Sequence, residues 1–257
     1  MKKNNLITLI PIVTAFFAMG FVDLVGTASN YVKDDFKLTD TVANLLPSMV
    51  FFWFFILAVP SGLLMNRIGR KRTVLLSLIV TLPSLLIPLI HYSVASVMVS
   101  FALLGIGNTM MQVSLNPLIA TVVSSERSAS TLTFGQFVKA ISSFMAPILA
   151  TWAATYFEDW RMLLFPLFAA VAVVVVIWLG MTKIDEPKPS TENVSVWRCL
   201  GLLSDSVVLL LFLGIMAHVG LDVGINVTAP RILIERIGLT LKDANYATGF
   251  YFIFRTT

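Results

Sequence analysis

The sequence contains few of the residues on which catalytic and disulfide-bonded proteins depend. It has one cysteine, Cys199, and two histidines, His91 and His218. One cysteine excludes an internal disulfide, and two histidines in separate segments do not make a metal-ligand set. Neither an HExxH nor a GxSxG pattern occurs. We therefore expect no enzyme, no metal site and no cofactor.

Charged residues are also scarce. They form 12% of the chain, about half the share found in soluble domains, while hydrophobic residues form 57%. Mean hydropathy is +0.88. This balance leaves too little polar surface for a soluble protein, so the lipid bilayer is the expected partner. The net charge of +4 does not indicate nucleic acid, because the cations lie in turns between apolar runs.

Runs without charge predict an all-α membrane protein with eight transmembrane helices, since each crossing needs about 20 apolar residues. The predicted spans cover residues 6–30, 42–65, 73–90, 95–122, 132–156, 162–181 and 207–230, with an eighth that begins near 244 and is only partly complete. Residues 1–182 are predicted to form an N-terminal six-helix bundle. Residues 183–206 follow as a cytoplasmic linker, and 207–257 as an incomplete start of a C-terminal bundle, with helix 7 and part of helix 8.

The two sets of predicted loops differ in positive charge. Loops on the side of the N-terminus hold ten of the 18 Lys and Arg residues, and the opposite loops hold six. The other two, Lys139 and Arg255, lie within predicted spans. Because Lys and Arg are retained in the cytoplasm, we expect a cytoplasmic N-terminus. We also expect a monomer in a bacterial inner membrane.

The stretch from Gly62 to Arg72 joins the second and third predicted helices and holds four cations. By composition alone it is an ordinary basic turn. Its spacing resembles the loop signature of the major facilitator superfamily, G-x-x-x-[DN]-[RK]-x-G-R-[RK]. The signature positions, which the resemblance implies to be a gating loop, are filled by Gly62, Asn66, Arg67, Gly69, Arg70 and Lys71. Asn66 stands where many members have Asp, so it keeps a hydrogen-bonding group but lacks the charge.

An internal repeat is visible at an offset of 201 residues. Leu38-Thr39 recurs as Leu239-Thr240, and Ala43-Asn44 recurs as Ala244-Asn245. Two six-helix halves related by a parallel repeat are an architecture of this superfamily. The same offset places the second copy of the basic loop near position 263, past the last residue. We therefore expect the chain to hold the first half of a transporter and a fragment of the second.

Four predicted helices carry polar residues at helical spacing on an otherwise apolar surface. Ionisable groups inside a bilayer are costly and usually functional. The four stripes are Asp23, Thr27 and Asn30; Asn108, Gln112 and Asn116; Gln136, Lys139 and Ser143; and His218, Asp222 and Asn226. We expect them to face one another across a central cavity. The alternative is that the amides and hydroxyls only hydrogen-bond between helices.

Two segments carry a narrower resemblance. The stretch 105–117, with its Gly-x-Gly, Gln112 and Asn116, looks like helix 4 of the fucose–galactose–glucose:proton symporter branch. The stretch 219–225 is similar to the Val-Gly-x-Glu-Val-x-Ile of helix 7 in that branch. This resemblance implies alternating-access transport of a small polar solute, a sugar, by proton symport. It implies solute binding at Gln112, Asn116, Gln136, Lys139, Asp222 and Asn226.

Two positions depart from the branch. Gln112 replaces the acid of helix 4, and Lys139 occupies a position where the branch has an amide. Glutamine binds a sugar hydroxyl but carries no proton, so Asp23 and Asp222 are the acids left for proton coupling. We favour Asp23, with Lys139 as its counter-charge. The alternatives are a drug or metabolite exporter with the same fold, and a membrane-embedded receptor or enzyme; the amides favour a hydroxylated solute.

Overall fold

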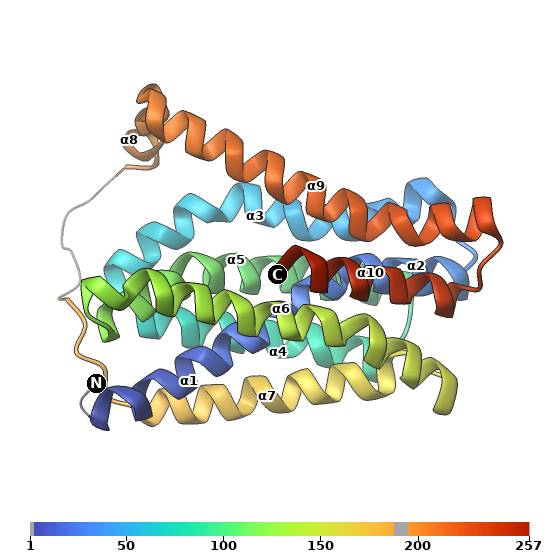
Figure 1. Cartoon of the computed structure of the whole chain (residues 1–257), viewed down its shortest axis with the longest axis horizontal. Coiled ribbons are helices and arrows are strands. Elements are labelled where there is room, and N and C mark those ends of the chain that lie inside the picture. The colour runs from blue at the N-terminus through green and yellow to red at the C-terminus, as the bar shows by residue number, and fades with distance from the viewer. Residues whose placement is uncertain (1–2, 188–194, 257) are drawn as a thin grey trace.

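A computed structural model describes residues 3–187 and 195–256 of the chain. Within these ranges every regular element is a helix, and the long helices lie side by side (Figure 1). Seven helical spans in the described residues are long and apolar enough to cross a membrane. The all-α membrane fold predicted from the sequence is confirmed.

The first span is built from three consecutive elements and each of the next five from one. They are α1 (Lys3–Met19), η1 (Gly20–Leu24), α2 (Val25–Asp35), α3 (Asp40–Ile68), α4 (Arg70–Ile90), α5 (Val94–Val122), α6 (Ser125–Tyr156) and α7 (Arg161–Met181). The remaining elements are α8 (Val196–Gly201), η2 (Leu202–Ser204), α9 (Ser206–Ile237) and α10 (Leu241–Thr256). Among them, α5 packs against α3 and α4, α7 against α4, and α6 against α1 and α10.

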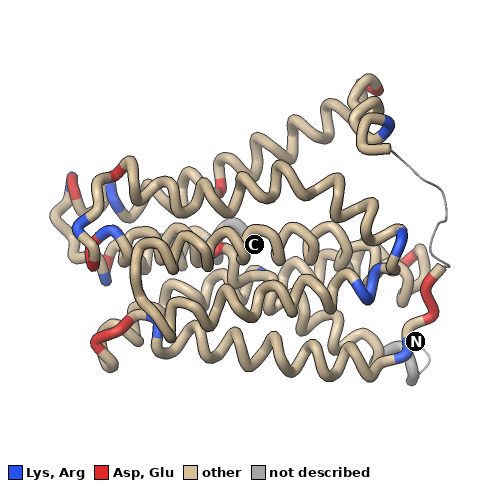
Figure 2. Tube along the Cα trace, turned by 180° about the vertical axis from the view of Figure 1, so that it is seen from behind, with Lys and Arg blue, Asp and Glu red and all other residues tan. Residues whose placement is uncertain are grey.

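Most charged residues lie toward the two ends of the helices, and the middle is mostly uncharged (Figure 2). We call the end with the basic loop, residues 67–72, the inner end. The end with the turn at residues 36–39 is the outer end. The inner end is the one that the distribution of positive charge predicts to face the cytoplasm.

The first span changes helix type near its middle. Gly20–Leu24 forms a 3-10 helix between α1 and α2. A Cβ at Gly20 would lie 2.6 Å from the carbonyl oxygen of Lys139, so only glycine lets α6 approach this closely. A 3-10 stretch within a long helix often marks a functional position, and Asp23 lies in this one.

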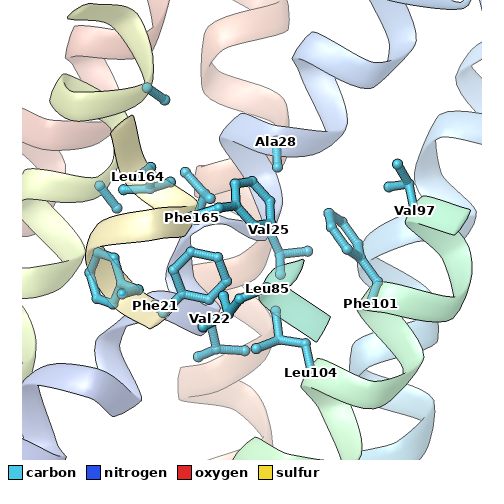
Figure 3. Packing of buried hydrophobic residues seen from close by; sticks show 14 of the residues in the cluster. Phe21, Val22, Val25, Ala28, Leu85, Val97, Phe101, Leu104, Leu164 and Phe165 are labelled. Atoms are coloured by element: carbon cyan, nitrogen blue, oxygen red, sulfur yellow. The ribbon is translucent and has the colours of Figure 1, made fainter. Parts of the chain in front are cut away.

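Two apolar clusters fill the six-helix bundle. In the outer cluster, the ring of Phe21 lies edge-on to Phe165 with a centroid distance of 5.4 Å (Figure 3). The inner cluster is built around Phe16, Leu78 and Leu115, all fully buried. Because the first span contributes to both clusters, its position in the bundle is fixed on both sides of the 3-10 stretch. In a bilayer such packing stabilises by close contact rather than by removal of water.

The internal repeat is present in the backbone. α3 and α10 begin 201 residues apart, and each is preceded by a capping threonine. The Thr39 hydroxyl accepts a hydrogen bond from the Val42 amide at 3.5 Å, and the Thr240 hydroxyl accepts one from the Asp243 amide at 3.2 Å. These caps satisfy amides that the first turn of each helix leaves without a partner.

The turns before the two caps also match. Lys37 has φ of 51° and Gly238 has φ of 76°, and these residues are again 201 apart. Both therefore have left-handed backbone conformations, which glycine adopts freely and other residues adopt at a cost. The same turn joins both helix pairs although the residue that makes it differs.

Several predicted boundaries are wrong. α6 begins at Ser125 rather than 132, because Ser124 has the extended backbone of a cap and Glu126 lies in the first turn, where the helix dipole favours an acid. α9 continues through Pro230 to Ile237, since a membrane helix tolerates proline where neighbours compensate. The predicted linker, residues 183–206, contains α8. Residues 188–194 of the linker lie outside the described part of the chain.

The two halves of α9 have different surroundings. Its buried residues, Asn226, Val227 and Pro230, lie in the outer half, and α9 packs against α2. Residues 206–218 are exposed, and this part diverges from the other helices toward α8 (Figure 1). α9 is therefore in contact with the six-helix bundle in its outer half and apart from it in its inner half.

Candidate functional site

An ion pair lies at the 3-10 stretch of the first span. The Lys139 Nζ on α6 is 3.6 Å from the Asp23 Oδ2, and the two side chains are 17% and 20% exposed. The Ser143 hydroxyl, one turn further along α6, donates to the same Asp23 oxygen at 2.5 Å. Partial burial strengthens the attraction because the local dielectric is lower than that of water. The carboxylate is therefore held by one cation and one hydroxyl from a single helix.

Asn226 brings α9 to the same place. Its Nδ2 donates to the main-chain oxygen of Asp23 at 2.6 Å, and its side chain lies against Gly26. Asn226 is 7% exposed. The predicted solute-binding amide thus has its donor engaged by the first span. It connects the segment that holds the carboxylate to the second part of the chain.

Asp222 shares a small cavity with Asp23. The cavity has a volume of about 30 Å³, and Asn226 also lines it. Within its own part of the chain, Asp222 accepts a hydrogen bond from the Tyr251 hydroxyl. The His218 Nε2 lies 3.5 Å from the other carboxylate oxygen. No sequence pattern indicated Tyr251, which the helix pair α9–α10 brings to Asp222.

The predicted amide residues lie on α5 and α6, further toward the inner end. The Gln136 amide donates to the Asn116 Oδ1 at 3.3 Å, and Gln136 is exposed. Gln112 lies one turn before Asn116 on α5 and is half-buried. Asn108 does not join them, because it is 4% exposed within the six-helix bundle. The structure therefore brings Asn116 and Gln136 together, toward the inner end of α5 and α6.

The basic loop is held by an acid from the segment after α7. The two Glu186 carboxylate oxygens accept hydrogen bonds from the Arg70 and Lys71 backbone amides, at 2.6 and 2.8 Å. An acid at a helix N-terminus also has a favourable interaction with the helix dipole. Gly69, with φ of 95°, makes the turn that presents these amides. Glu186 was not predicted as a functional residue, since its only signal was an acid beside a proline after the sixth apolar span.

The basic side chains of this loop reach neighbouring helix ends. The Lys71 Nζ donates to the carbonyl oxygens of Gly180 and Thr182, at 3.0 and 2.7 Å. The Arg70 guanidinium donates to the Pro117 carbonyl oxygen at 3.1 Å. The bonds of Lys71 satisfy carbonyl groups that the end of α7 leaves open. Of the other signature positions, Gly62 packs near Val113 on α5, and Asn66 and Arg67 are exposed.

Comparison with known proteins gives one family. Residues 12–256 match the Major Facilitator Superfamily. The chain is 26% identical to a glucose/galactose transporter of Brucella abortus biovar 1 (strain 9-941), over 97% of the chain and 64% of that protein. It is 23% identical to the probable nitrate transporter NarT of Staphylococcus carnosus (strain TM300), over 88% of the chain and 57% of that protein. The chain thus spans less than two thirds of the length of these relatives.

Solved structures share the fold. A bacterial homologue of the human lysosomal transporter Spinster, in an inward-facing and unoccupied conformation, superposes with a TM-score of 0.70 at 14% identity. That match covers 97% of this chain and 59% of the other. A D-xylose–proton symporter superposes with a TM-score of 0.59 at 17% identity, over 98% of this chain and 66% of the other. At such identities the likeness concerns the fold alone.

Proposed function

Since the chain belongs to the Major Facilitator Superfamily, we propose that it forms the larger part of a secondary transporter that carries a small polar solute, a sugar, by proton symport. The observation that carries this proposal is the ion pair between Asp23 and Lys139 in a broken span. Ionised groups at this depth are costly unless they are used. In this family architecture, solute and coupling ion bind near the midplane, where helices are interrupted.

Two observations favour a sugar over an apolar solute. The amides of Asn116 and Gln136 lie together toward the inner end, and amides offer both donors and acceptors to hydroxyl groups. The Brucella relative, matched over 97% of this chain, is described as a glucose/galactose transporter. Gln112, one turn from Asn116, would extend the same polar face.

Coupling follows from the charge on Asp23. A proton on this carboxylate removes the negative charge that faces Lys139, so the ion pair is lost and Lys139 becomes able to interact with the solute. The main-chain oxygen of Asp23 is bonded to Asn226, so movement of this segment changes a contact with α9. A ligand or proton shifts a conformational equilibrium only through such differences in interaction between the states.

Uptake into vesicles tests the proposal. Because the chain spans 64% of the Brucella relative, the assay uses a version extended with the corresponding remaining helices of that protein. This version should accumulate labelled glucose or galactose when an inward proton gradient is imposed, and the 257-residue chain should not. A folded extended version that transports neither sugar would overturn the sugar proposal. Transport of nitrate instead would support an anionic solute, for which Lys139 is a suitable partner.

The orientation has its own test. Cys199, the single cysteine, lies in α8 within the predicted linker and is partly exposed. An impermeant thiol reagent should label it in inside-out vesicles and not in intact cells. Labelling from the outside alone would reverse the proposed topology without affecting the proposal about the solute.

A further inference from the structure

One arginine makes most of the polar contact between α9 and the six-helix bundle at the outer end. The Arg231 Nε donates to the Asn30 Oδ1 at 2.9 Å, and its Nη1 donates to the Asn44 Oδ1 at 2.6 Å. The same Nη1 lies 3.5 Å from the Asp40 carboxylate. The Arg231 side chain is 12% exposed. Its three partners all belong to α2 and α3, so a single side chain from α9 connects it to both helices.

The repeat explains why this contact lies where it does. Arg231 and Asn30 are 201 residues apart and are therefore equivalent positions of the two halves. Asn44 is equivalent to Asn245, which in turn lies beside Tyr31 of α2. When two halves are related by an axis, equivalent residues meet only close to that axis. The Asn30–Arg231 bond thus marks the outer end of the axis, where opening of the outer side must separate the halves.

The contact is polar and leaves one donor unused. The Arg231 Nη2 is buried and has no hydrogen-bond partner among the described residues. The Asp40 oxygen near Arg231 also lies 2.6 Å from the Lys33 Nζ, so the two cations share it. A cavity of about 450 Å³, lined by Asn30, Arg231 and the exposed Lys37, reaches the contact from the outer side. Water entering this cavity can hydrate the guanidinium after it separates from its partners. Breaking the contact therefore does not leave a buried charge without hydrogen bonds.

We propose that Arg231 is the positioning residue that keeps the outer side closed. Its bonds to Asn30, Asn44 and Asp40 hold the two parts together in the conformation seen here, and they break when the outer side opens. The inference follows from the fold and from these bonds. It holds whatever the solute and the coupling ion are, so its failure and that of the sugar proposal are separate results.

Labelling of a buried cysteine from the outer side tests this role. Val227 is 8% exposed and lies one turn, about 6 Å, deeper along α9 than Arg231. In a Cys199→Ser background, Val227→Cys should react slowly with an impermeant thiol reagent applied to the outer face. Adding Arg231→Ala should raise the labelling rate about tenfold or more, because hydrogen bonds to a charged group are lost. Arg231→Lys keeps the charge without the forked geometry and should give an intermediate rate.

Two further variants make the result decisive. Arg236 is exposed on the same helix, and Arg236→Ala should leave the labelling rate unchanged. Asn44→Ala removes one partner of Arg231 and should raise the rate in the same direction by less, which keeps the proposal testable if Arg231→Ala does not fold. Unchanged labelling in both Arg231→Ala and Asn44→Ala, in proteins with parental helicity and monodispersity, would overturn the proposal. An equal rise in Arg236→Ala would also overturn it, because it would indicate general loosening.

Discussion

The first helix pair, from α1 to α3, and the second pair, α9 and α10, share one plan but differ at one point. Both have the same left-handed turn and the same threonine cap, 201 residues apart. The first span is interrupted by a 3-10 stretch at Asp23, whereas the equivalent position, Gly224, lies within the uninterrupted α9. The two repeats therefore share the backbone arrangement of their turns and caps, and the 3-10 interruption in the first makes them chemically different.

The inequality extends to the acids. Asp23 pairs with Lys139 and Ser143 from another helix of the six-helix bundle. Asp222 is bonded to Tyr251 and faces His218, both within the second part of the chain. A proton on Asp23 thus alters a contact of the broken span, while a proton on Asp222 alters contacts inside one helix pair. On the proposed mechanism, the first half carries the coupling chemistry and α9 carries the contact that responds to it.

The largest expected effect concerns the two acids, Asp23 and Asp222, whose substitutions should have different consequences for transport. In the extended transporter, Asp23→Asn should abolish accumulation driven by a proton gradient, because the ion pair can no longer be switched by protonation. Exchange of solute between preloaded vesicles should remain, since it needs binding and rocking but no net proton release. Asp222→Asn should instead weaken solute binding and keep gradient-driven accumulation. The measurement is labelled-sugar uptake with a gradient, beside exchange without one.

The opposite result would assign proton coupling to a residue other than Asp23. If Asp23→Asn accumulates solute at the parental level, Asp23 is not the coupling acid, and coupling through Asp222 or uncoupled transport becomes the better mechanism. Parental levels of folded protein in the membrane are the control for both variants.

A second prediction compares glycines at the contact and away from it. A Cβ at Gly26 would lie 2.6 Å from the Asn226 Oδ1 and 2.9 Å from its main-chain oxygen. Overpacking of this kind costs about 1–3 kcal/mol, so Gly26→Ala should lower the thermal unfolding temperature of the purified protein. A Cβ at Gly224 would meet no atom of another described segment within 4 Å, so Gly224→Ala should leave stability unchanged or raise it by up to about 1 kcal/mol through helix propensity. Equal shifts in both variants would contradict the close packing of α9 on α2.

A third prediction compares the turn residues of the two repeats, Lys37 and Gly238. Gly238→Ala should destabilise the turn by about 1–2 kcal/mol, because a side chain is disfavoured at positive φ. Lys37→Gly should relieve the same strain in the first repeat, but glycine also makes the unfolded chain more flexible. The net gain should therefore be below about 1 kcal/mol. Denaturant unfolding measures both, and a loss of stability with Lys37→Gly would show that the lysine side chain has another role.

The smallest expected effect concerns pH and the outer end of the six-helix bundle. The Tyr92 hydroxyl donates to the Asp35 Oδ2 at 2.5 Å, and the Trp160 Nε1 donates to the same oxygen at 3.1 Å. Burial, and then the bond to Asp35, raise the pKa of Tyr92 well above its ordinary value of 10.0. The contribution of this tyrosine to the free energy of unfolding is therefore complete below about pH 10. It declines as the pH rises from there through the raised pKa. This loop contact should be insensitive to pH near neutrality.

The raised pKa of Tyr92 can be checked by following the absorbance of tyrosine phenolates as the pH is raised. Tyr92→Phe should remove one late-titrating tyrosine and leave the earlier part of the curve unchanged. Loss of an early-titrating group instead would show that Tyr92 is in contact with solvent.

The spans could be predicted from the sequence because a chain of this composition can place its long uncharged stretches only in a lipid bilayer. The stripes of Asp23 and Lys139 also placed these two residues on facing helices. The 3-10 stretch could not be predicted, because no proline marks it and the approach of α6 at Gly20 is a tertiary contact. Arg231 was assigned to a loop because Pro230 looks like a helix end, although the membrane helix continues past it.

The 3-10 stretch has a geometric consequence for the whole first span. Five residues of 3-10 helix advance about 10 Å and turn the chain through about 600°, against about 7.5 Å and 500° for an α-helix. The outer part of the span is therefore rotated by about 100° relative to a straight helical wheel drawn from α1. Asp23 lies near the end of the stretch, so most of this rotation is complete before it, and Asp23 is nearly in phase with α2 rather than with α1. Substitutions in α2 have to be chosen on a wheel of its own, phased from Val25.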